Sequence, residues 1–310
     1  MARIFARKER RNTLITIVGP TASGKSALAV KLARRFGGEI ISADSRQVYR
    51  GLDIGSGKIT KKQMMGVPHH LLDVASPARK FSVARYQKLA LKSIQSIRKR
   101  GKLPILVGGT PFYVYAVVDG YAFPEVKPNQ KLRDSLAGLS NQELLVKLKK
   151  LDSRRAKTIE QKNRRRLIRA LEIVMTTGKP IPKLEKHSPL FDVLMVGIKR
   201  SPEKLKRRIQ KRLLDRFDHG MITEVKRLQN PPTGGGLSWK RLEELGLEYR
   251  YIARYLQAKI SYEDMVDLIQ KESEDFARRQ MLWFKRDPRI HWILSHTEAR
   301  RLVQNYLKKL

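Results

Sequence analysis

One eight-residue stretch, Gly19-Pro-Thr-Ala-Ser-Gly-Lys-Ser26, constrains the fold of this chain more than any other part of its sequence. It matches the pattern G-x-x-x-x-G-K-S/T at every fixed position. It follows the apolar run TLITIV and opens a segment of helical periodicity that ends near Phe36. Between a strand and a helix, such glycines let backbone N–H groups wrap around an anion, and the helix N-terminus adds positive potential. The stretch therefore predicts a phosphate-binding loop in an α/β fold.

Two side chains at the end of the loop add to this anion chemistry. Lys25 supplies a positive charge, and the hydroxyl of Ser26 has the position that holds Mg²⁺ in such loops. The predicted phosphate-binding residues are Gly19, Pro20, Thr21, Ala22, Ser23, Gly24, Lys25 and Ser26. The loop alone does not identify the phosphorylated molecule that it binds.

Strand-like and helix-like segments alternate on both sides of the loop. After the first strand, apolar runs recur at GEIIS and LPILVG, with helices expected over about 25–36 and 82–100. The later runs DVLMVGI and RIHWIL predict two further strands. A βαβαβ order of this kind is typical of a mostly parallel sheet covered by helices, as in P-loop NTPase-like proteins.

The segment between the two halves of this pattern has a different character. Pro124 and Pro128 interrupt the alternation, and only helical periodicity with many charges follows. We therefore predict a P-loop-type core from residues 12–119 and 191–310, with a helical insertion domain at 120–190. Residues 1–11 are predicted to be a basic N-terminal arm.

The charge balance points to a polyanionic partner. The chain has 66 Lys and Arg against 29 Asp and Glu, a formal net charge of +37. A surface of this kind attracts nucleic acid, and a membrane partner is not expected because no apolar run is long enough to span a bilayer. The sequence has no cysteine, which excludes disulfides and thiolate chemistry. No secretory signal is recognisable, so we expect a cytoplasmic protein, and nothing indicates a protein partner.

Two polar positions follow the second and third predicted strands. Asp44 lies just past EIIS, where a parallel strand delivers its last residues to a ligand crevice. Its carboxylate fits a magnesium ligand or a general base, but it equally fits the cap of a turn. Thr110 ends the run LVGGT, where an NTPase would carry an aspartate for Mg²⁺. The two glycines before it indicate either the close approach of a ligand or a tight strand-to-helix turn.

Eight segments resemble the bacterial tRNA dimethylallyltransferase family, also called tRNA isopentenyltransferases or IPP transferases. They occur in the family's order over nearly the whole chain: GPTASGKSALAVKLA, EIISADSRQVYRGLDIGSGK, PHHLLD, ILVGGTPFYVYAVVDG, RRRLIRALEI, TTGKP, GLEYRYIARYLQAKISYEDM and FARRQMLWFKRD. The block SADSRQVY after such a loop is the most specific of these, because a generic P-loop kinase does not carry it.

The resemblance implies an activity. In the family the loop holds the diphosphate of dimethylallyl diphosphate, with Mg²⁺ as cofactor. The dimethylallyl group moves to N6 of the adenosine on the 3′ side of the tRNA anticodon, and pyrophosphate leaves. The resemblance assigns catalytic roles to Asp44, which accepts the proton of N6, to Thr110 and to Lys25.

The resemblance also implies contacts with the anticodon stem-loop of tRNA. These contacts carry over onto Asp44, Ser45, Arg46, Gln47, Thr110, Arg133, Arg165, Arg166, Leu167, Ile168, Arg169, Tyr249 and Arg250. The chain departs from the family pattern at Pro111, where relatives usually have glycine, and at Ser273 and Glu274, where an arginine is expected. These departures affect fine contacts and leave the loop and Asp44 intact.

Three other functions fit parts of the pattern. An adenylate dimethylallyltransferase would share the loop and Asp44, but would not need the charge of +37 or the insertion. A nucleotide or small-molecule kinase would use ATP as phosphate donor. A non-catalytic RNA-binding protein would have no need of an intact loop and Asp44.

Overall fold

The computed structural model describes residues 12–124, 126–182, 191–232 and 234–309. They fold as two compact units. The larger unit lies within residues 1–119 and 189–310, and the smaller unit lies within residues 120–188.

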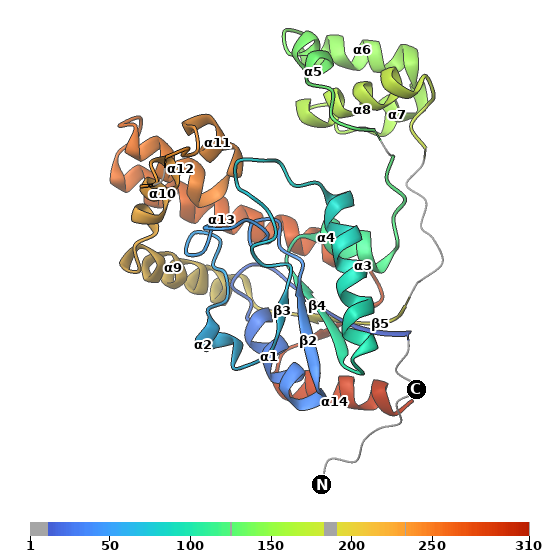
Figure 1. The fold of residues 1–310 in the computed structure, drawn as a ribbon, viewed down its shortest axis with the longest axis vertical. Coiled ribbons are helices and arrows are strands. Elements are labelled where there is room, and N and C mark those ends of the chain that lie inside the picture. The colour runs from blue at the N-terminus through green and yellow to red at the C-terminus, as the bar shows by residue number, and fades with distance from the viewer. Residues whose placement is uncertain (1–11, 125, 183–190, 233, 310) are drawn as a thin grey trace. The chain divides into compact units, whose positions relative to one another are not determined.

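A parallel sheet forms the centre of the larger unit (Figure 1). In the described residues its strands are β1 (Thr13–Val18), β2 (Gly38–Ser42), β3 (His69–His70), β4 (Leu103–Gly108), β5 (Asp192–Ile198) and β6 (Ile290–Ile293). Their order is β3-β2-β4-β1-β5-β6, and every neighbouring pair is parallel. All six residues of β1 are buried, which explains its unbroken apolar run. The predicted α/β class with a parallel sheet is confirmed.

Helices cover the sheet and extend beyond it. They are α1 (Lys25–Phe36), α2 (Lys61–Met64), α3 (Val83–Lys99), α4 (Pro111–Val118), α9 (Pro202–Asp218), α10 (Met221–Gln229), α11 (Trp239–Leu245), α12 (Leu247–Leu256), α13 (Tyr262–Phe284) and α14 (His296–Lys308). The helix predicted over 25–36 has these bounds in the structure, because it begins after Gly24 and ends at Gly37, both with a positive φ.

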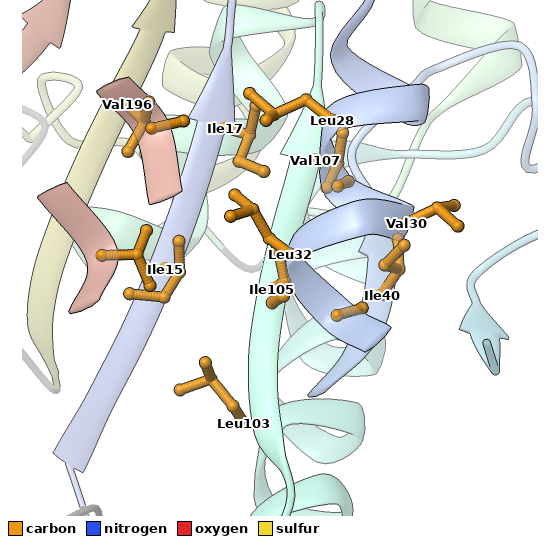
Figure 2. Close-up of a cluster of buried hydrophobic side chains, with 14 of the residues drawn as sticks. Ile15, Ile17, Leu28, Val30, Leu32, Ile40, Leu103, Ile105, Val107 and Val196 are labelled. Atoms are coloured by element: carbon orange, nitrogen blue, oxygen red, sulfur yellow. The ribbon is translucent and has the colours of Figure 1, made fainter. Parts of the chain in front are cut away.

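One face of the sheet forms an apolar core. Ile15 and Ile17 of β1 pack there with Leu28 and Leu32 of α1 (Figure 2), and Val303 of α14 belongs to the same cluster. Side chains alternate along a strand, so the intervening residues of β1 point to the opposite face. On β2 and β4 that face is covered by α3, whose Tyr86 hydroxyl donates to the Ser42 carbonyl.

The regular elements in the described residues of the smaller unit are all helices. Its helices are α5 (Gln130–Leu136), α6 (Asn141–Leu151), α7 (Ser153–Thr158) and α8 (Arg164–Thr177). The side chains of Asn129, Ser140, Asp152 and Asn163 cap their N-termini. Such caps satisfy amides that have no partner within the helix. The unit also has its own buried cluster, formed by Leu136, Leu144, Leu148, Ala156, Ile159, Leu167, Ala170, Leu171 and Val174.

Candidate active site

The site lies at the carboxyl edge of the parallel sheet. Strand β4 is hydrogen-bonded between β2 and β1, so the loops that follow these three strands are neighbours. They carry Asp44 after β2, Thr110 after β4 and the phosphate-binding loop after β1. Ligands of open α/β sheets bind at this edge. The topology therefore places the three polar features of the sequence together.

The phosphate-binding loop has the backbone shape that an anion requires. Gly19 and Gly24 have φ values of 147° and 101°, and Ala22 has a φ of 57°. Gly24 leads directly into α1, whose first turn contains no acidic residue. The buried Ser23 hydroxyl has no hydrogen-bond partner among the described residues. Since buried polar atoms are normally paired, this orphaned hydroxyl fits the oxygen of a bound anion.

Lys25 lies inside the loop. Its ammonium nitrogen donates to the Pro20 carbonyl at 2.6 Å. The pKa of Lys25 is lowered to about 7, mainly by burial and also by the nearby Arg212 guanidinium, against the opposing effect of the Asp44 carboxylate. A bound diphosphate would favour the charged form, so the loop suits a strongly anionic ligand.

Three arginines of α9 extend the positive field of the loop. They were not predicted as site residues from the sequence. Arg208, Arg212 and Arg216 are spaced by four residues and so share one face of the helix. Arg208 Nε donates to the Ala22 carbonyl of the loop at 2.6 Å. Their four-residue spacing is the signal in the sequence, but it does not reveal that α9 lies beside the loop.

The middle arginine of this row has the most unusual setting. The pKa of Arg212 is lowered to about 10, mainly by burial and also by neighbouring Arg216. Arg216 pairs with Glu248 at 2.7 Å, whereas no carboxylate lies within 4 Å of Arg212 in the described part of the chain. A partly buried guanidinium that no carboxylate contacts directly is costly, so this position favours a bound anion.

The structure shows how Asp44 is held. Its Oδ1 accepts hydrogen bonds from the backbone amides of Arg46 at 2.8 Å and Gln47 at 3.3 Å. The capping role considered from the sequence is therefore real. Both bonds end on Oδ1, so they leave Oδ2 for a further interaction. The charge of this carboxylate raises the pKa of both Lys25 and Arg212, which places it beside the anion site.

Thr110 and the glycines before it form a tight turn against the Asp44 segment. Thr110 Oγ1 accepts from the Ser45 amide at 3.1 Å, and its own amide donates to the Ala43 carbonyl at 3.3 Å. A Cβ on Gly108 would lie 2.1 Å from that carbonyl. Gly108 is therefore required by contact with the chain itself, which favours the tight turn over the close approach of a ligand.

Tyr249, one of the predicted RNA contacts, is a buried residue. It is 1% exposed, and its hydroxyl donates to Glu224 Oε1 at 2.9 Å. Glu224 also accepts from the backbone amides of Asp53, Ile54 and Gly55 at 2.6–3.0 Å. Tyr249 is thus part of a buried network that fixes the 52–58 loop.

Leu167 is a second predicted RNA contact that lies in a core. It is fully buried in the core of the smaller unit, where Ile168 also packs against the cluster. Arg165 and Arg166, the neighbours of Leu167 on α8, are exposed. A helix repeats every 3.6 residues, so one basic segment necessarily presents both a solvent face and a core face.

Arg133 and Arg169 share one acceptor within the smaller unit. Both bind the buried carboxylate of Glu172, at 2.8 Å and 2.5 Å. The pKa of Glu172 is about 2, because these hydrogen bonds and that of the Asn129 amide outweigh the opposing effect of burial. Both arginines therefore have a structural role, whatever further contact they make.

The remaining predicted RNA residues lie in the larger unit. Ser45, Arg46 and Gln47 follow Asp44 directly and are partly exposed. Arg250 pairs with Glu272 at 3.3 Å and is also partly exposed.

A classical metal cluster is not found in the described part of the chain, where no three His, Cys, Asp or Glu side chains come together. His70 Nε2 lies 2.7 Å from Glu39 Oε2, which also binds Arg100, so this histidine has a structural partner. No described helix is both long enough and apolar enough to cross a membrane.

Comparison with known proteins gives consistent matches. The family model described as IPP transferase matches residues 47–287. The tRNA dimethylallyltransferase of Carboxydothermus hydrogenoformans is 40% identical over 294 residues, which cover 92% of this chain and 93% of that relative.

Solved structures match over similar lengths. The crystal structure of the full-length tRNA isopentenylpyrophosphate transferase from Bacillus halodurans has 35% identity and a TM-score of 0.70. The match covers 96% of this chain and 97% of that one. A eukaryotic dimethylallyltransferase acting on tRNA has 27% identity and a TM-score of 0.75, over 88% of this chain and 69% of that one.

Proposed function

This chain belongs to the IPP transferase family, and on that premise we propose that it is a tRNA dimethylallyltransferase. It transfers a dimethylallyl group from dimethylallyl diphosphate to N6 of the adenosine on the 3′ side of the tRNA anticodon. One observation carries the proposal beyond the family match. The anion site built from the loop and the α9 arginines lies beside a carboxylate that keeps one oxygen for a further interaction.

The reaction needs two opposite functions within one site. The bond between C1 of the dimethylallyl group and the diphosphate oxygen breaks, and its electron pair stays on the diphosphate. The loop amides, Lys25 and Arg212 stabilise that developing charge. The bond between N6 and C1 forms, and the nitrogen becomes cationic until it loses a proton.

Asp44 is proposed to accept that proton. The N6 amine is a poor nucleophile, because its lone pair is delocalised into the adenine ring. A carboxylate of ordinary basicity suffices when proton transfer follows bond formation, since cationic nitrogen is a strong acid. The Arg46 and Gln47 amides fix the carboxylate through Oδ1 and leave Oδ2 to face the substrate. Thr110, which accepts a hydrogen bond from the Ser45 amide, holds the turn beside Asp44.

Magnesium fits this site as a partner of the diphosphate. Mg²⁺ usually keeps several waters and binds substrate phosphates with only one or two protein oxygens. The exposed Ser26 hydroxyl on the first turn of α1 is the proposed ligand. When bound, the ion would neutralise charge on the leaving diphosphate.

The tRNA is proposed to bind through several basic positions. The net charge of +37 supports binding of a polyanion, and the exposed Arg165 and Arg166 are proposed phosphate contacts. Asp44, Ser45, Arg46, Gln47 and Thr110 are proposed to contact the target nucleotide. Arg133, Ile168, Arg169 and Arg250 remain proposed contacts, through atoms that their ion pairs and packing leave exposed. Because its substrate is tRNA, we propose that the protein acts in the cytoplasm.

Nucleoside mass spectrometry tests the proposal. Unmodified tRNA, or free AMP, is incubated with the protein, Mg²⁺ and dimethylallyl diphosphate, without ATP. We expect N6-dimethylallyladenosine in digested tRNA and no modified AMP. Modified AMP alone would make the protein an adenylate dimethylallyltransferase. No product, together with ATP turnover in a parallel reaction, would replace the proposal by a kinase.

A further inference from the structure

One buried side chain joins the two loops of the site that have different chemical roles. Gln280 of α13 is 3% exposed. Its Oε1 accepts from the Thr21 amide of the phosphate-binding loop at 2.8 Å. Its Nε2 donates to the Gly109 carbonyl, immediately before Thr110, at 2.5 Å. A single planar amide therefore spans the ends of β1 and β4.

The backbone beside this bridge leaves no room for a larger residue at position 109. A Cβ on Gly109 would lie 2.5 Å from Gln280 Nε2, so a larger residue at position 109 would push the amide away. The bridge uses one acceptor and one donor at once, and an amide side chain supplies both in one plane without depending on its protonation state. This explains Gly109 by contact with Gln280 rather than with a ligand.

We propose that Gln280 is a positioning residue that fixes the diphosphate-binding loop relative to the Thr110 turn. The Thr110 turn also holds the Asp44 segment, through its hydrogen bonds to Ser45 and Ala43. Gln280 thereby sets the separation between the leaving group and the proton acceptor. This inference rests on the proposed function, because that function assigns opposite roles to the two loops. Small errors in such separations cost large factors in rate.

The test compares Gln280→Glu with Gln280→Met. An ionised glutamate still accepts from the Thr21 amide but cannot donate to the Gly109 carbonyl. A protonated glutamate can do both, since it carries one carbonyl oxygen and one hydroxyl. Methionine has a similar volume and restores neither bond. The glutamate variant therefore switches the bridge with pH, without a change in shape.

We expect both variants to lose about tenfold or more in kcat at about pH 8.5, with the Kd for tRNA unchanged. From about pH 8.5 to about pH 6, the ratio of Gln280→Glu kcat to wild-type kcat should rise at least about fivefold, because protonation restores the donor. The ratio for Gln280→Met should stay flat. Dividing by the wild-type rate removes the titration of every group that the two proteins share.

Gln87→Glu is the matched control. Gln87 Nε2 donates to the Ala116 carbonyl at 2.6 Å, so this variant also loses an amide donor to a backbone carbonyl, but away from the loop. Its kcat ratio should stay near one across the same pH range. A purely stabilising role of Gln280 would lower the melting temperature of the variants and leave the pH ratio flat.

Hydrogen exchange gives a readout that does not depend on activity. In Gln280→Met the Thr21 amide should exchange much faster than in wild type, while amides inside β1 stay protected. The inference is overturned if both variants keep wild-type kcat within about twofold, or if Thr21 exchange is unchanged. Absence of product from the wild-type chain would count against the proposed function instead, and Thr21 exchange would still test the bridge.

Discussion

At the scale of single residues, neighbouring groups shift the pKa values of the basic side chains at the site. Lys25 lies beside a second cation, Arg212, and its pKa is about 7. The two cations are therefore poised for an anion that neutralises both. Asp44 can serve both as a cap and as the proposed proton acceptor, because both capping bonds end on Oδ1.

Diphosphate binding should take up a proton at Lys25. In the ligand-free protein the pKa of Lys25 is about 7, so the side chain is mostly neutral at about pH 8 and mostly charged at about pH 6. A bound anion raises the pKa again, so about 0.9 proton should enter at about pH 8 and little at about pH 6. Calorimetry in buffers of different ionisation enthalpy measures this uptake, and Lys25→Met subtracts the ligand's own protons. Equal uptake by both proteins would contradict the assignment.

Asp44→Asn should separate proton acceptance from capping. The asparagine oxygen still accepts from the Arg46 and Gln47 amides, whereas Asp44→Ala removes that acceptor. Both variants should lose about 100-fold or more in kcat, because both lack the carboxylate. Only the alanine variant should also lose about 1–2 kcal/mol of unfolding free energy. Turnover of Asp44→Asn within a few-fold of wild type would exclude the carboxylate as proton acceptor.

Motif residues were predictable at this scale because their spacing is local. The loop, Asp44 and Thr110 follow consecutive strands, and the strand order was enough to bring them together. Tyr249, Arg212 and Gln280 depend on contacts between distant segments. Tyr249 meets Glu224 across 25 residues, and Gln280 meets Thr21 across 259 residues. No local pattern encodes such contacts.

At the scale of elements, the 52–58 loop depends on α10 and α12. Glu224 of α10 accepts three successive loop amides, and Tyr249 of α12 both donates to Glu224 and accepts from the Ser56 amide. The Gly57 carbonyl then accepts from Gln47 Nε2, next to the Asp44 cap. The loop therefore connects these two helices to the site.

Glu224→Gln should loosen this loop. Its single side-chain oxygen cannot replace the two carboxylate oxygens that serve four donors, so about two buried donors lose their partners. We expect a loss of about 2–4 kcal/mol in unfolding free energy, measured with urea, and faster exchange of the Ile54 and Gly55 amides. Tyr249→Phe removes one donor and should cost about 1 kcal/mol. Equal stability of Glu224→Gln and wild type would contradict this role of the carboxylate.

At the scale of the whole molecule, the chain has a net charge of +37 and folds as two compact units. The helical character of the smaller unit was predictable from its periodicity. The partners of its arginines were not, because Glu172 lies in the apolar run of α8 and its burial pairs it with Arg133 and Arg169. Part of the positive charge is thus paired with a buried carboxylate inside the protein.

Binding of tRNA should fall steeply with salt. If several phosphates are neutralised, the log of the affinity falls linearly with the log of the salt concentration, with a slope of about −4 or steeper. Replacing Arg165 and Arg166 by alanine should weaken binding and reduce the slope by about one to two, because both are exposed. Filter binding over a salt series measures both effects. A flat dependence would rule out phosphate contacts as the main source of affinity.

The most direct measurement follows pyrophosphate and modified adenosine in one ATP-free reaction. The protein, unmodified tRNA, Mg²⁺ and dimethylallyl diphosphate are mixed, and both products are quantified over time. If the loop holds the diphosphate of a prenyl donor, one pyrophosphate is released for each N6-dimethylallyladenosine formed, and added ATP changes neither rate. A requirement for ATP, or pyrophosphate release without modified adenosine, would contradict this use of the loop.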